Sequence, residues 1–374
     1  MKVLSVITGL NCGGAENLLL EICKEQKKRG FSQKVIYLTK REYLLDAFLN
    51  SGIETVLIDV QKIGVIRAIF EIRKQVKSFS PDIINTHLVM ADSLTRLACL
   101  WLKNIKLFSS IHSLDDWKNK NTISSVFMKS FNRFTINCIK NYYLIAVSKS
   151  AKDFCIKREK IKEEKIFVLY NFTSIDSNKS EIPVTRQQLG FEERDFVLIN
   201  VGRLVPEKSQ ITLLRAVKAL KDDGFSNVKA IILGDGPLRE KLELFIKENG
   251  LEGTVLLPGF MVNTYSYMKI SDLFVLTSLI EGFSLVTVEA FYNRVPVVSG
   301  DMPTIRELIT DRESGLFYPV GDVSALTGTI KDIIEGKYDL KSFTDKAFET
   351  YQKFTPDIFF ENLEKIYGIN HKNK

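Results

Sequence analysis

Short apolar runs alternate with longer segments of helical period along almost the whole of this 374-residue chain. Several of the short runs, such as VLSVI near the start and LIAV further on, are apolar at both odd and even positions. A strand that is apolar on both faces is typical of a parallel sheet covered by helices on each side. The alternation therefore predicts an α/β fold of doubly wound parallel sheets. The clearest of the helical segments is IGVIRAIFEIRKQVKSF, an amphipathic helix with apolar residues at Ile63, Ile66, Ile69, Phe70, Val76 and Phe79.

The chain length and the order of the strands indicate two domains. Strands are expected at residues 2–9, 34–39, 54–60, 82–87, 107–112, 143–147 and 165–170, and again at 195–202, 228–234, 254–259, 273–278 and 295–300. The polar stretch 173–187 separates the two sets and is the expected linker. We therefore expect a Rossmann-like N-terminal domain over 1–174, a second one over 188–354, and a final helix within 355–374 that packs back on the first. Such sheets bind ligands beyond the carboxyl ends of their strands, so a site is expected in the cleft between the domains.

Charge is divided unevenly along the chain. The net charge is +7, yet residues 1–175 carry 28 basic and 16 acidic side chains, so the first half is positive and the second half is negative. A basic surface suits an anionic partner such as nucleic acid, phospholipid or a phosphorylated substrate, and it can also serve solubility alone.

The cysteines and the apolar runs bear on the compartment. The five cysteines include no C-x-x-C pair, which argues against a disulfide framework and a structural zinc site and favours the reducing cytosol. The chain has no apolar run of about 18 residues and no cleavable signal pattern. We therefore expect a cytoplasmic chain that is soluble or bound peripherally to the inner face of the cytoplasmic membrane.

A glycine-rich turn, NCGGAE, follows the first expected strand. Glycines at such a turn let the backbone approach a ligand, and the N–H groups that begin the next helix favour anionic oxygens. Gly14 is therefore a candidate phosphate contact, and an ordinary strand-to-helix turn is an equally good interpretation. The dinucleotide fingerprint G-x-G-x-x-G is matched neither here nor at Gly234-Asp235-Gly236, where Arg239 stands at the third glycine position. A nicotinamide-dependent dehydrogenase is thus disfavoured.

Charged side chains follow two expected strands of the second half. Arg203 and Lys208 lie in NVGRLVPEKS, where a guanidinium and an ammonium at a strand's carboxyl end can converge on one diphosphate. Two solvated cations on a loop are the simpler alternative. The segment LFVLTSLIEGFSLVTVEAFYNRVPVV carries Glu281 on a loop and Glu289 on the next helix. Carboxylates accept paired sugar hydroxyls well, and Glu289 lies among apolar neighbours, which is costly for a carboxylate without a ligand or partner.

Two of the three histidines end expected strands of the first half. His87 closes IINTH and His112 closes LFSSIH, and either could hydrogen-bond a substrate hydroxyl or relay a proton. A structural histidine is an equally good interpretation for His87 and a weaker one for His112, which lies near Ser110 and Ser113. Two histidines without a third ligand make a weak metal site, and the chain contains no Asp-x-Asp motif. We therefore expect neither a metal nor a cofactor.

In their order and spacing these motifs resemble those of glycosyltransferase family 4, which are retaining nucleotide-sugar transferases of GT-B architecture. The resemblance runs from GGAE through NVGRLVPEKS, ILGDGPL, LLPGF and EGFSLVTVEA to PTIRELITDRESGLFYPVGD, and so covers nearly the whole chain. It implies two Rossmann-like domains facing a central cleft. It also implies a nucleotide-diphosphate sugar as donor, which we expect to be a UDP-hexose.

The resemblance implies a catalytic set of four residues. Glu281 would bind hydroxyls of the transferred sugar, and His112 would approach the sugar beside the reacting carbon. Arg203 and Lys208 would hold the diphosphate, whose negative charge grows as it departs.

The resemblance further implies a set of nucleotide contacts. Glu289 would bind the ribose hydroxyls. The other expected contacts lie near the base or reach the diphosphate through main-chain N–H groups, and they are Gly14, Pro258, Gly259, Phe260, Phe283, Ser284 and Leu285. Ser209 and Ser284 replace glycines that are frequent in the family.

A basic segment between Cys99 and Ser150 is interleaved with aromatic residues. It holds eight basic and two acidic side chains, and its aromatic ones are Trp101, Phe108, Trp117, Phe127, Phe131, Phe134, Tyr142 and Tyr143. Cations beside aromatic rings suit an anionic membrane interface. We therefore expect this face to dock on the membrane, where it would meet a lipid-linked saccharide acceptor in surface polysaccharide or glycolipid synthesis. The alternative is that the aromatic residues belong to the core.

Three other functions compete with glycosyl transfer. A nucleotide-sugar epimerase or hydrolase could share the architecture, and a non-catalytic subunit could bind a sugar nucleotide without turnover. Nucleic-acid binding is disfavoured because no recognised binding motif accompanies the basic charge.

Overall fold

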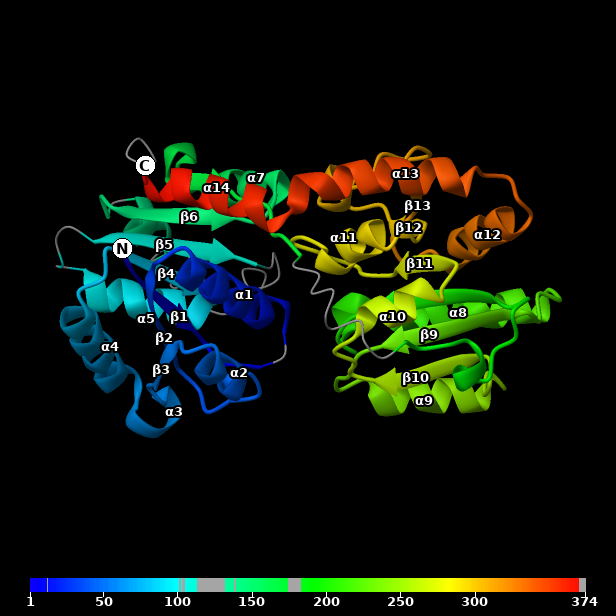
Figure 1. Cartoon of the computed structure of the whole chain (residues 1–374), viewed down its shortest axis with the longest axis horizontal. Helices are drawn as coiled ribbons and strands as arrows, with labels where there is room; N and C mark the ends of the chain where they lie inside the picture. The colour runs from blue at the N-terminus through cyan, green and yellow to red at the C-terminus, as the bar shows by residue number, and fades with distance from the viewer. Residues whose placement is uncertain are drawn as a thin grey trace. The chain divides into compact units, whose positions relative to one another are not determined.

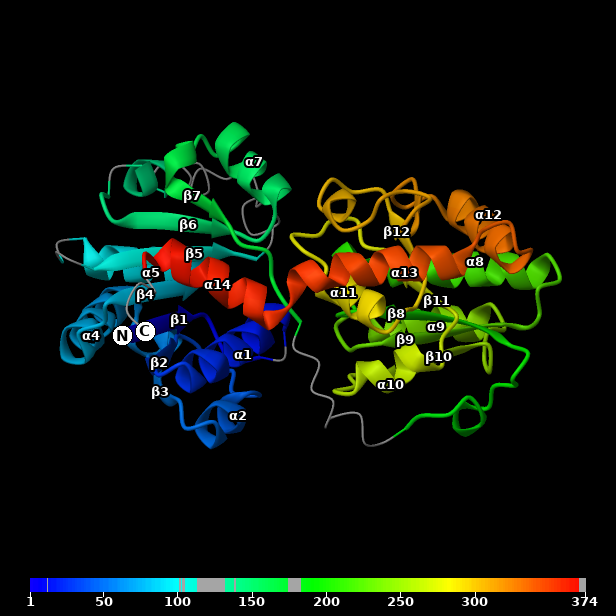
Figure 2. The same ribbon diagram turned by 45° about the horizontal axis from the view of Figure 1, so that its top comes forward.

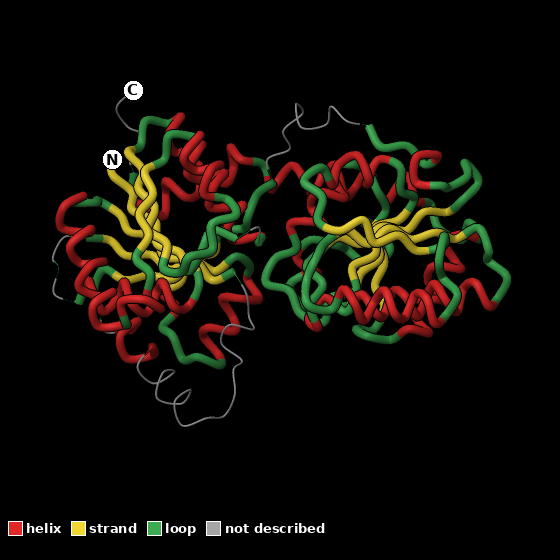
Figure 3. The backbone as a smooth tube through the Cα atoms, turned by 90° about the horizontal axis from the view of Figure 1, so that it is seen from below, coloured by secondary structure: helices red, strands yellow, loops and turns green. Residues whose placement is uncertain are grey.

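The computed structural model describes residues 1–11, 13–100, 102, 105–112, 132–137, 139–173 and 183–369. The chain divides into two compact units, Met1–Phe172 with Pro356–Lys374, and Thr173–Thr355. Each unit is built on one parallel sheet with helices on both of its faces (Figure 3). The prediction of two doubly wound α/β sheets is therefore confirmed.

The sheet of the first unit has the strand order β3-β2-β1-β4-β5-β6-β7. Each strand expected from the sequence is present, with its ends displaced by at most three residues: β1 (Lys2–Ile7), β2 (Ser32–Tyr37), β3 (Glu54–Leu57), β4 (Ile83–His87), β5 (Lys106–Ile111), β6 (Tyr142–Ala146) and β7 (Ile166–Val168). The order reverses between β1 and β4, so their following connections cross to opposite faces of the sheet. A crevice at such a reversal is where doubly wound sheets bind ligands.

Two layers of helices cover this sheet. One face carries α3 (Val60–Ile63), α4 (Val65–Phe79), α5 (Val89–Cys99) and α7 (Lys149–Lys157), which bury residues such as Ile72 and Leu94 against Leu4 and Ile84 of the strands. The other face carries α1 (Gly14–Lys28) and α2 (Leu45–Asn50). Both faces of the strands are thus removed from water, as their apolar runs require.

The C-terminal helix α14 (Pro356–Tyr367) belongs to the first unit (Figure 1, Figure 2). Its Phe359, Phe360 and Leu363 share one apolar cluster with Leu18 of α1 and with residues of β1, β4, β5 and β6. The last described helix therefore packs on the sheet that contains the first strand.

Helix α4 differs from the expected amphipathic pattern. Its inward stripe is Ala68, Ile72 and Val76, whereas Ile66 and Phe70 are 74% and 67% exposed. At 100° per residue, these two side chains lie roughly 200° around the helix from Ala68 and Ile72. The expectation that they join the other apolar positions of the segment on one buried face is therefore wrong, and α4 has a second apolar stripe that faces solvent.

The sheet of the second unit has the order β10-β9-β8-β11-β12-β13 and reverses between β8 and β11. Its strands are β8 (Phe196–Val201), β9 (Val228–Leu233), β10 (Val255–Gly259), β11 (Leu273–Leu276), β12 (Val297–Gly300) and β13 (Leu316–Tyr318). The sequence analysis predicted the first five and missed β13, because three residues are too few to display a period.

The helices of this unit are α8 (Gln210–Asp222), α9 (Arg239–Glu248), α10 (Thr264–Lys269), α11 (Leu285–Tyr292), α12 (Val323–Ile334) and α13 (Leu340–Tyr351). Residues of α8, α9 and α12 make one large apolar core with the strands, and α11 packs against α13. Among the helices of the described residues, none is both long enough and apolar enough to cross a membrane.

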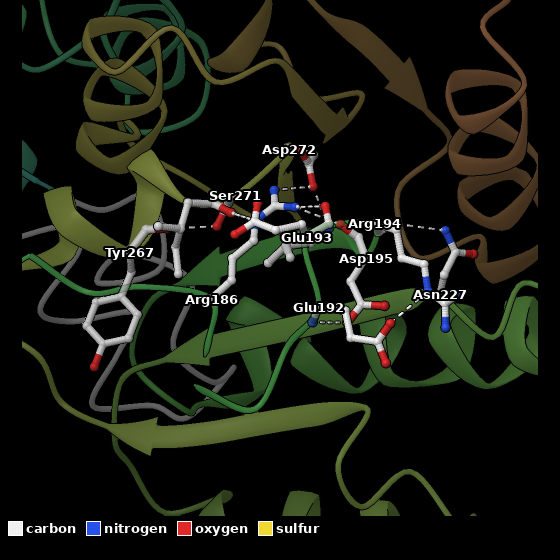
Figure 4. A network of polar contacts seen from close by, with 11 residues as sticks. Arg186, Glu192, Glu193, Arg194, Asp195, Asn227, Tyr267, Ser271 and Asp272 are labelled. Carbon is white, nitrogen blue, oxygen red and sulfur yellow. Dashed lines mark hydrogen bonds and ion pairs between the residues drawn. The ribbon is translucent and has the colours of Figure 1, made fainter. Parts of the chain in front are cut away.

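Arg186 connects several segments at the start of the second unit through hydrogen bonds and an ion pair (Figure 4). Its guanidinium donates to the main-chain oxygens of Ile270, Glu193 and Asp195 at 2.9 to 3.0 Å. It also forms an ion pair with the carboxylate of Asp272 at 2.8 Å. One planar group with several fixed donors thus holds the segment before β8 to the segment before β11.

We predict that Arg186→Met loosens this edge of the second sheet. The loss removes charge-assisted hydrogen bonds worth roughly 2 kcal/mol together and leaves Asp272 with the N–H of Val197, so amides of β8 and β11 should exchange about 30-fold faster. Hydrogen–deuterium exchange measures this directly. The matched control is Arg194→Met, since Arg194 is 81% exposed and pairs only at the surface with Glu192, and its exchange should stay within about twofold of the wild type. Equal exchange in the two variants would contradict the assignment.

Candidate active site

Lys208 and Glu281 meet at the carboxyl edge of the second sheet. Nζ of Lys208 lies 2.6 Å from Oε1 of Glu281, and the hydroxyl of Ser278 donates to the same oxygen at 2.7 Å. Glu281 is only 8% exposed, so the ammonium balances a largely buried carboxylate. The sequence singled out both residues but gave them separate roles, and their direct contact was not predicted.

The strand order explains why these two residues meet. Lys208 ends a 3₁₀ turn (Pro206–Lys208) after β8, and Glu281 follows β11, the neighbouring strand. Two further bonds lock the two connections together: Thr277 Oγ1 donates to the main-chain oxygen of Lys208 and the N–H of Leu279 to that of Glu207, both at 2.8 Å. The pair therefore lies where the sheet order reverses, which is the usual ligand position in such folds.

Ser209 adopts a left-handed backbone with φ of 47° directly after Lys208. A non-glycine residue in this conformation costs about 1 kcal/mol, which explains why glycine suits the position. The Ser209 hydroxyl lies 2.9 Å from that of Thr212 and so gains a local hydrogen bond.

Arg203 lies on the same connection but is exposed, and its main-chain oxygen accepts a bond from the side chain of Gln210 at 3.0 Å. The connection after β9 packs closely against it, because a Cβ on Gly234 would lie 1.9 Å from the main-chain oxygen of Gly202. The glycines around Asp235 therefore serve close backbone packing here, in agreement with the absence of a dinucleotide fingerprint.

Glu289 lies on α11, half-buried, and accepts a hydrogen bond from Thr264 at 3.2 Å. Burial raises the pKa of Glu289 from its ordinary 4.5 to about 7, and the bond from Thr264 offsets only part of this shift. Ser284 is the N-cap of α11 and is buried, as is Phe283 before it, while Leu285 is the first residue of the helix. The first-turn N–H groups of α11 and the carboxylate of Glu289 thus belong to one short helix.

The connection after β10 leads to α10, whose first residue is hydrogen-bonded to Glu289. Pro258 and Gly259 are its last residues, with Gly259 at φ of 94°, and Phe260 after them is 40% exposed. Four residues beyond Phe260 the chain reaches Thr264, the partner of Glu289. The structure therefore links the expected base-binding turn to the expected ribose-binding carboxylate through α10.

In the first unit, Gly14 is the first residue of α1 and is exposed. A Cβ on Gly14 would meet no atom within 4 Å, whereas one on Gly13 would lie 2.4 Å from the carboxylate of Glu16. The space beside the main chain at Gly14 is therefore open, as a close approach of a ligand to this turn would require.

His87 and His112 contact each other at the carboxyl ends of β4 and β5. Nδ1 of His87 lies 2.9 Å from Nε2 of His112, and the two rings stack with centroids 5.2 Å apart. Burial lowers the pKa of His112 to about 4 and that of His87 well below its usual range. Both rings are therefore neutral at physiological pH.

The predicted catalytic and nucleotide-binding residues fall into two groups, since Gly14 and His112 lie in the first unit and all the others lie in the second. Lys208 pairs with Glu281, and Glu289 shares α11 with Ser284. The sequence missed Ser278 and Thr264, the hydrogen-bond donors to the two carboxylates. Ser278 could have been found from its position at the end of an apolar strand, whereas nothing in the sequence pairs Thr264 with a helix 25 residues further on.

The segment between Cys99 and Ser150 is described only in part. Phe108 and Tyr142 are buried in the core, whereas Phe134 is 68% exposed. The expected interfacial residues Trp101, Lys103, Trp117, Lys118, Lys120, Phe127, Lys129 and Phe131 lie outside the described residues. Within the described ranges, no three His, Cys, Asp or Glu side chains are grouped so that they could hold a metal ion.

Solved structures with the same fold cover nearly all of the chain. HepE from Anabaena in complex with UDP-glucose matches with a TM-score of 0.83 and 22% identity over 99% of this chain and 100% of that one. The apo form of the lipopolysaccharide outer core galactosyltransferase WaaB matches with a TM-score of 0.70 and 21% identity over 98% and 99% of the two chains. At this identity the matches establish the fold, which is GT-B.

Two curated relatives have specific names. One is a Campylobacter jejuni N-acetylgalactosamine-N,N'-diacetylbacillosaminyl-diphospho-undecaprenol 4-alpha-N-acetylgalactosaminyltransferase, 33% identical over 60% of this chain and 62% of that protein. The other is an Escherichia coli UDP-Gal:alpha-D-GlcNAc-diphosphoundecaprenol alpha-1,3-galactosyltransferase, 23% identical over 79% and 77%. The chain spans less than two thirds of the Campylobacter protein and 60% of an uncharacterized glycosyltransferase of Methanocaldococcus jannaschii.

Two family profiles divide the chain between them. Residues 12–177 match "Glycosyltransferase Family 4" and residues 181–350 match "Glycosyl transferases group 1". Together with the fold and the relatives, these matches confirm the resemblance noted in the sequence. The chain belongs to glycosyltransferase family 4.

Proposed function

We propose that this protein is a retaining glycosyltransferase that moves a hexose from a UDP-sugar to a saccharide carried on a lipid diphosphate. The observation that carries the proposal is the Lys208–Glu281 pair at the strand-order reversal of the second unit. A UDP-linked donor is supported by HepE, which binds UDP-glucose on the same fold. A lipid-linked acceptor is supported by the two relatives whose names specify diphospho-undecaprenol saccharides.

Lys208 is suited to hold the departing diphosphate. Its ammonium has three N–H donors, and one of them is directed at Glu281, which leaves two for phosphate oxygens. Negative charge on the β-phosphate grows as the bond to the sugar breaks, so a cation held in place stabilises the transition state more than the ground state. Exposed Arg203 and the first-turn N–H groups of α11 would add donors to the same group.

Glu281 is suited to orient the transferred sugar. Both of its hydrogen bonds end on Oε1, and neither uses Oε2, which can therefore accept from sugar hydroxyls. In front-face transfer the bond from the anomeric carbon to the phosphate oxygen breaks and a bond to the acceptor oxygen forms on the same side. The acceptor hydroxyl gives its proton to the departing phosphate oxygen, so the chemistry needs no separate base.

A saccharide on a lipid diphosphate is embedded in a membrane, so the enzyme must bind at the membrane surface. We propose that this contact with the membrane is made by α4. Ile66 and Phe70 lie on its outward face, and exposed Arg67, Lys74 and Lys77 flank them. Apolar side chains between cations suit the boundary between anionic headgroups and acyl chains. We propose α4 beside the segment 99–150, in which Phe108 and Tyr142 lie in the core and most of the expected interfacial residues lie outside the described residues.

The first prediction concerns the ion pair. Lys208→Met should lower kcat by about 100-fold or more, as expected for loss of a charge that stabilises the leaving group. The assay offers UDP-glucose, UDP-galactose and their N-acetylamino forms with a short-chain polyprenyl-diphosphate saccharide. The double variant Lys208→Met/Glu281→Gln leaves no unpaired buried charge and should fold well yet remain inactive. Lys218→Met, which removes a surface pair with Asp222, is the control and should retain wild-type activity.

The same assay separates the competing functions. Isomerised donor without transfer would indicate an epimerase, free sugar would indicate a hydrolase, and tight donor binding without turnover would indicate a non-catalytic subunit. Full activity of Lys208→Met would contradict the assigned site.

The second prediction concerns the pH dependence of donor binding. Because ribose hydroxyls donate to Glu289, the ligand favours its ionised form, and the pKa of about 7 in the free protein must fall in the complex. The affinity for UDP-glucose should therefore rise with pH from 5.5 and level off above about 7.5, by up to tenfold per pH unit. Isothermal titration calorimetry at several pH values measures this, and Glu289→Gln should bind more weakly with no such dependence. A pH-independent wild type would rule out the ribose contact.

The third prediction concerns α4. Replacing both Ile66 and Phe70 by Ser should reduce binding to phosphatidylglycerol vesicles by about 30-fold, since each buried apolar side chain contributes on the order of 1 kcal/mol when partly inserted and the two together contribute about 2 kcal/mol. Replacing Lys74 and Lys77 by Gln should weaken binding to these vesicles only, because neutral phosphatidylcholine offers no charge. Leu244→Ser is the matched control, since Leu244 is 55% exposed on α9 of the other unit. Flotation in which the α4 variants behave like the control would refute this surface.

A further inference from the structure

The contact between His87 and His112 is fixed by the sheet. His87 is the last residue of β4 and is paired in register with Ser110 of β5, two residues before His112. Parallel pairing therefore places both rings at one edge, where they stack at an interplanar angle of 19°. His87 is 1% exposed, whereas His112 is half-buried. Of the two rings, His112 is thus the one that a ligand can reach.

A single proton lies between the two rings. Both are neutral at physiological pH, and a neutral imidazole has one N–H donor and one bare acceptor nitrogen. The 2.9 Å contact joins Nδ1 of His87 to Nε2 of His112, so one of these nitrogens donates and the other accepts. Which one donates decides the tautomer of both rings.

The surroundings of His87 favour one of the two choices. Its Nε2 is fully buried and has no hydrogen-bond partner among the described residues. If His112 donated, His87 would carry its proton on Nε2, and a buried N–H would stand without an acceptor, which is rare in folded proteins. If His87 donates from Nδ1, its Nε2 is a bare nitrogen, and the residue lines a small cavity together with Asn85 and Ser110. The second arrangement leaves no N–H of His87 unpaired.

We propose that His87 is a positioning residue that holds His112 in a single tautomer. By donating from Nδ1 to Nε2 of His112, it fixes the proton of His112 on Nδ1 and so gives His112 an N–H donor for a hydroxyl of the transferred sugar. The assignment of the tautomer is argued from the geometry of the first unit alone. The contact between His112 and the sugar, in contrast, rests on the proposed function.

Nuclear magnetic resonance of the wild-type protein tests the tautomer without any substrate. With ring-labelled ¹⁵N-histidine, the three histidines of the chain give three ring systems, which single substitutions assign. We expect His112 to be protonated on Nδ1 and bare on Nε2, with the opposite pattern excluded at pH 7.5. A His112 protonated on Nε2, or one that exchanges between tautomers, would overturn the proposal.

Two variants test the role of His87 in transfer. Asn places an amide N–H near the position of Nδ1, so His87→Asn should keep the tautomer of His112 and a kcat/KM within about threefold of the wild type. His87→Leu offers no donor, so His112 should lose its fixed tautomer and kcat/KM should fall about tenfold or more, the scale seen when a group that orients a functional histidine is removed. Thermal unfolding of both variants controls for loss of structure. Equal kcat/KM in His87→Leu and the wild type would overturn the role in transfer, and so would a failure of His87→Asn to recover activity while its fold and tautomer are intact.

Discussion

The reversal of strand order in each parallel sheet is the constraint on which the rest of this structure depends. In both units the chain starts in the middle of the sheet, builds outward on one side and then crosses to the other. Two neighbouring strands consequently send their connections to opposite faces, and the carboxyl edge between them is left open. In the second unit these strands are β8 and β11, and their connections carry Lys208 and Glu281. In the first unit they are β1 and β4. The connection after β1 leads to Gly14, and His87 is the last residue of β4.

Burial of ionisable groups at these edges has a common physical consequence. Glu281 forms an ion pair with Lys208, whereas the carboxylate of Glu289 accepts a hydrogen bond from the hydroxyl of Thr264, and burial raises the pKa of Glu289 to about 7. The two histidines lose their charge and share a proton. Burial shifts the pKa of Glu289 and of His112, so a ligand that hydrogen-bonds to either group changes its protonation equilibrium.

The sequence was sufficient to predict the architecture because apolar runs and turns repeat with little ambiguity. Strands such as β1 and β8 are apolar on both faces, and that pattern requires a covered parallel sheet. The sequence did not predict which apolar side chains of α4 are buried. Ile66 and Phe70 are as apolar as the residues of the buried stripe, yet they are exposed. The sequence also failed at contacts between distant segments, since nothing in its pattern joins Thr264 to Glu289. It placed His87 and His112 at the ends of two strands that looked adjacent, but it did not predict their direct contact.

The central claim is that the Lys208–Glu281 edge supports departure of a nucleoside diphosphate with attack from the same side. The anomeric configuration of the product tests it most directly. With a UDP-α-sugar labelled with ¹³C at the anomeric carbon, carbon–proton coupling in the isolated product distinguishes α from β linkage. The account predicts an α-linked product. A β-linked product would contradict front-face transfer and would require a base on the opposite face of the sugar.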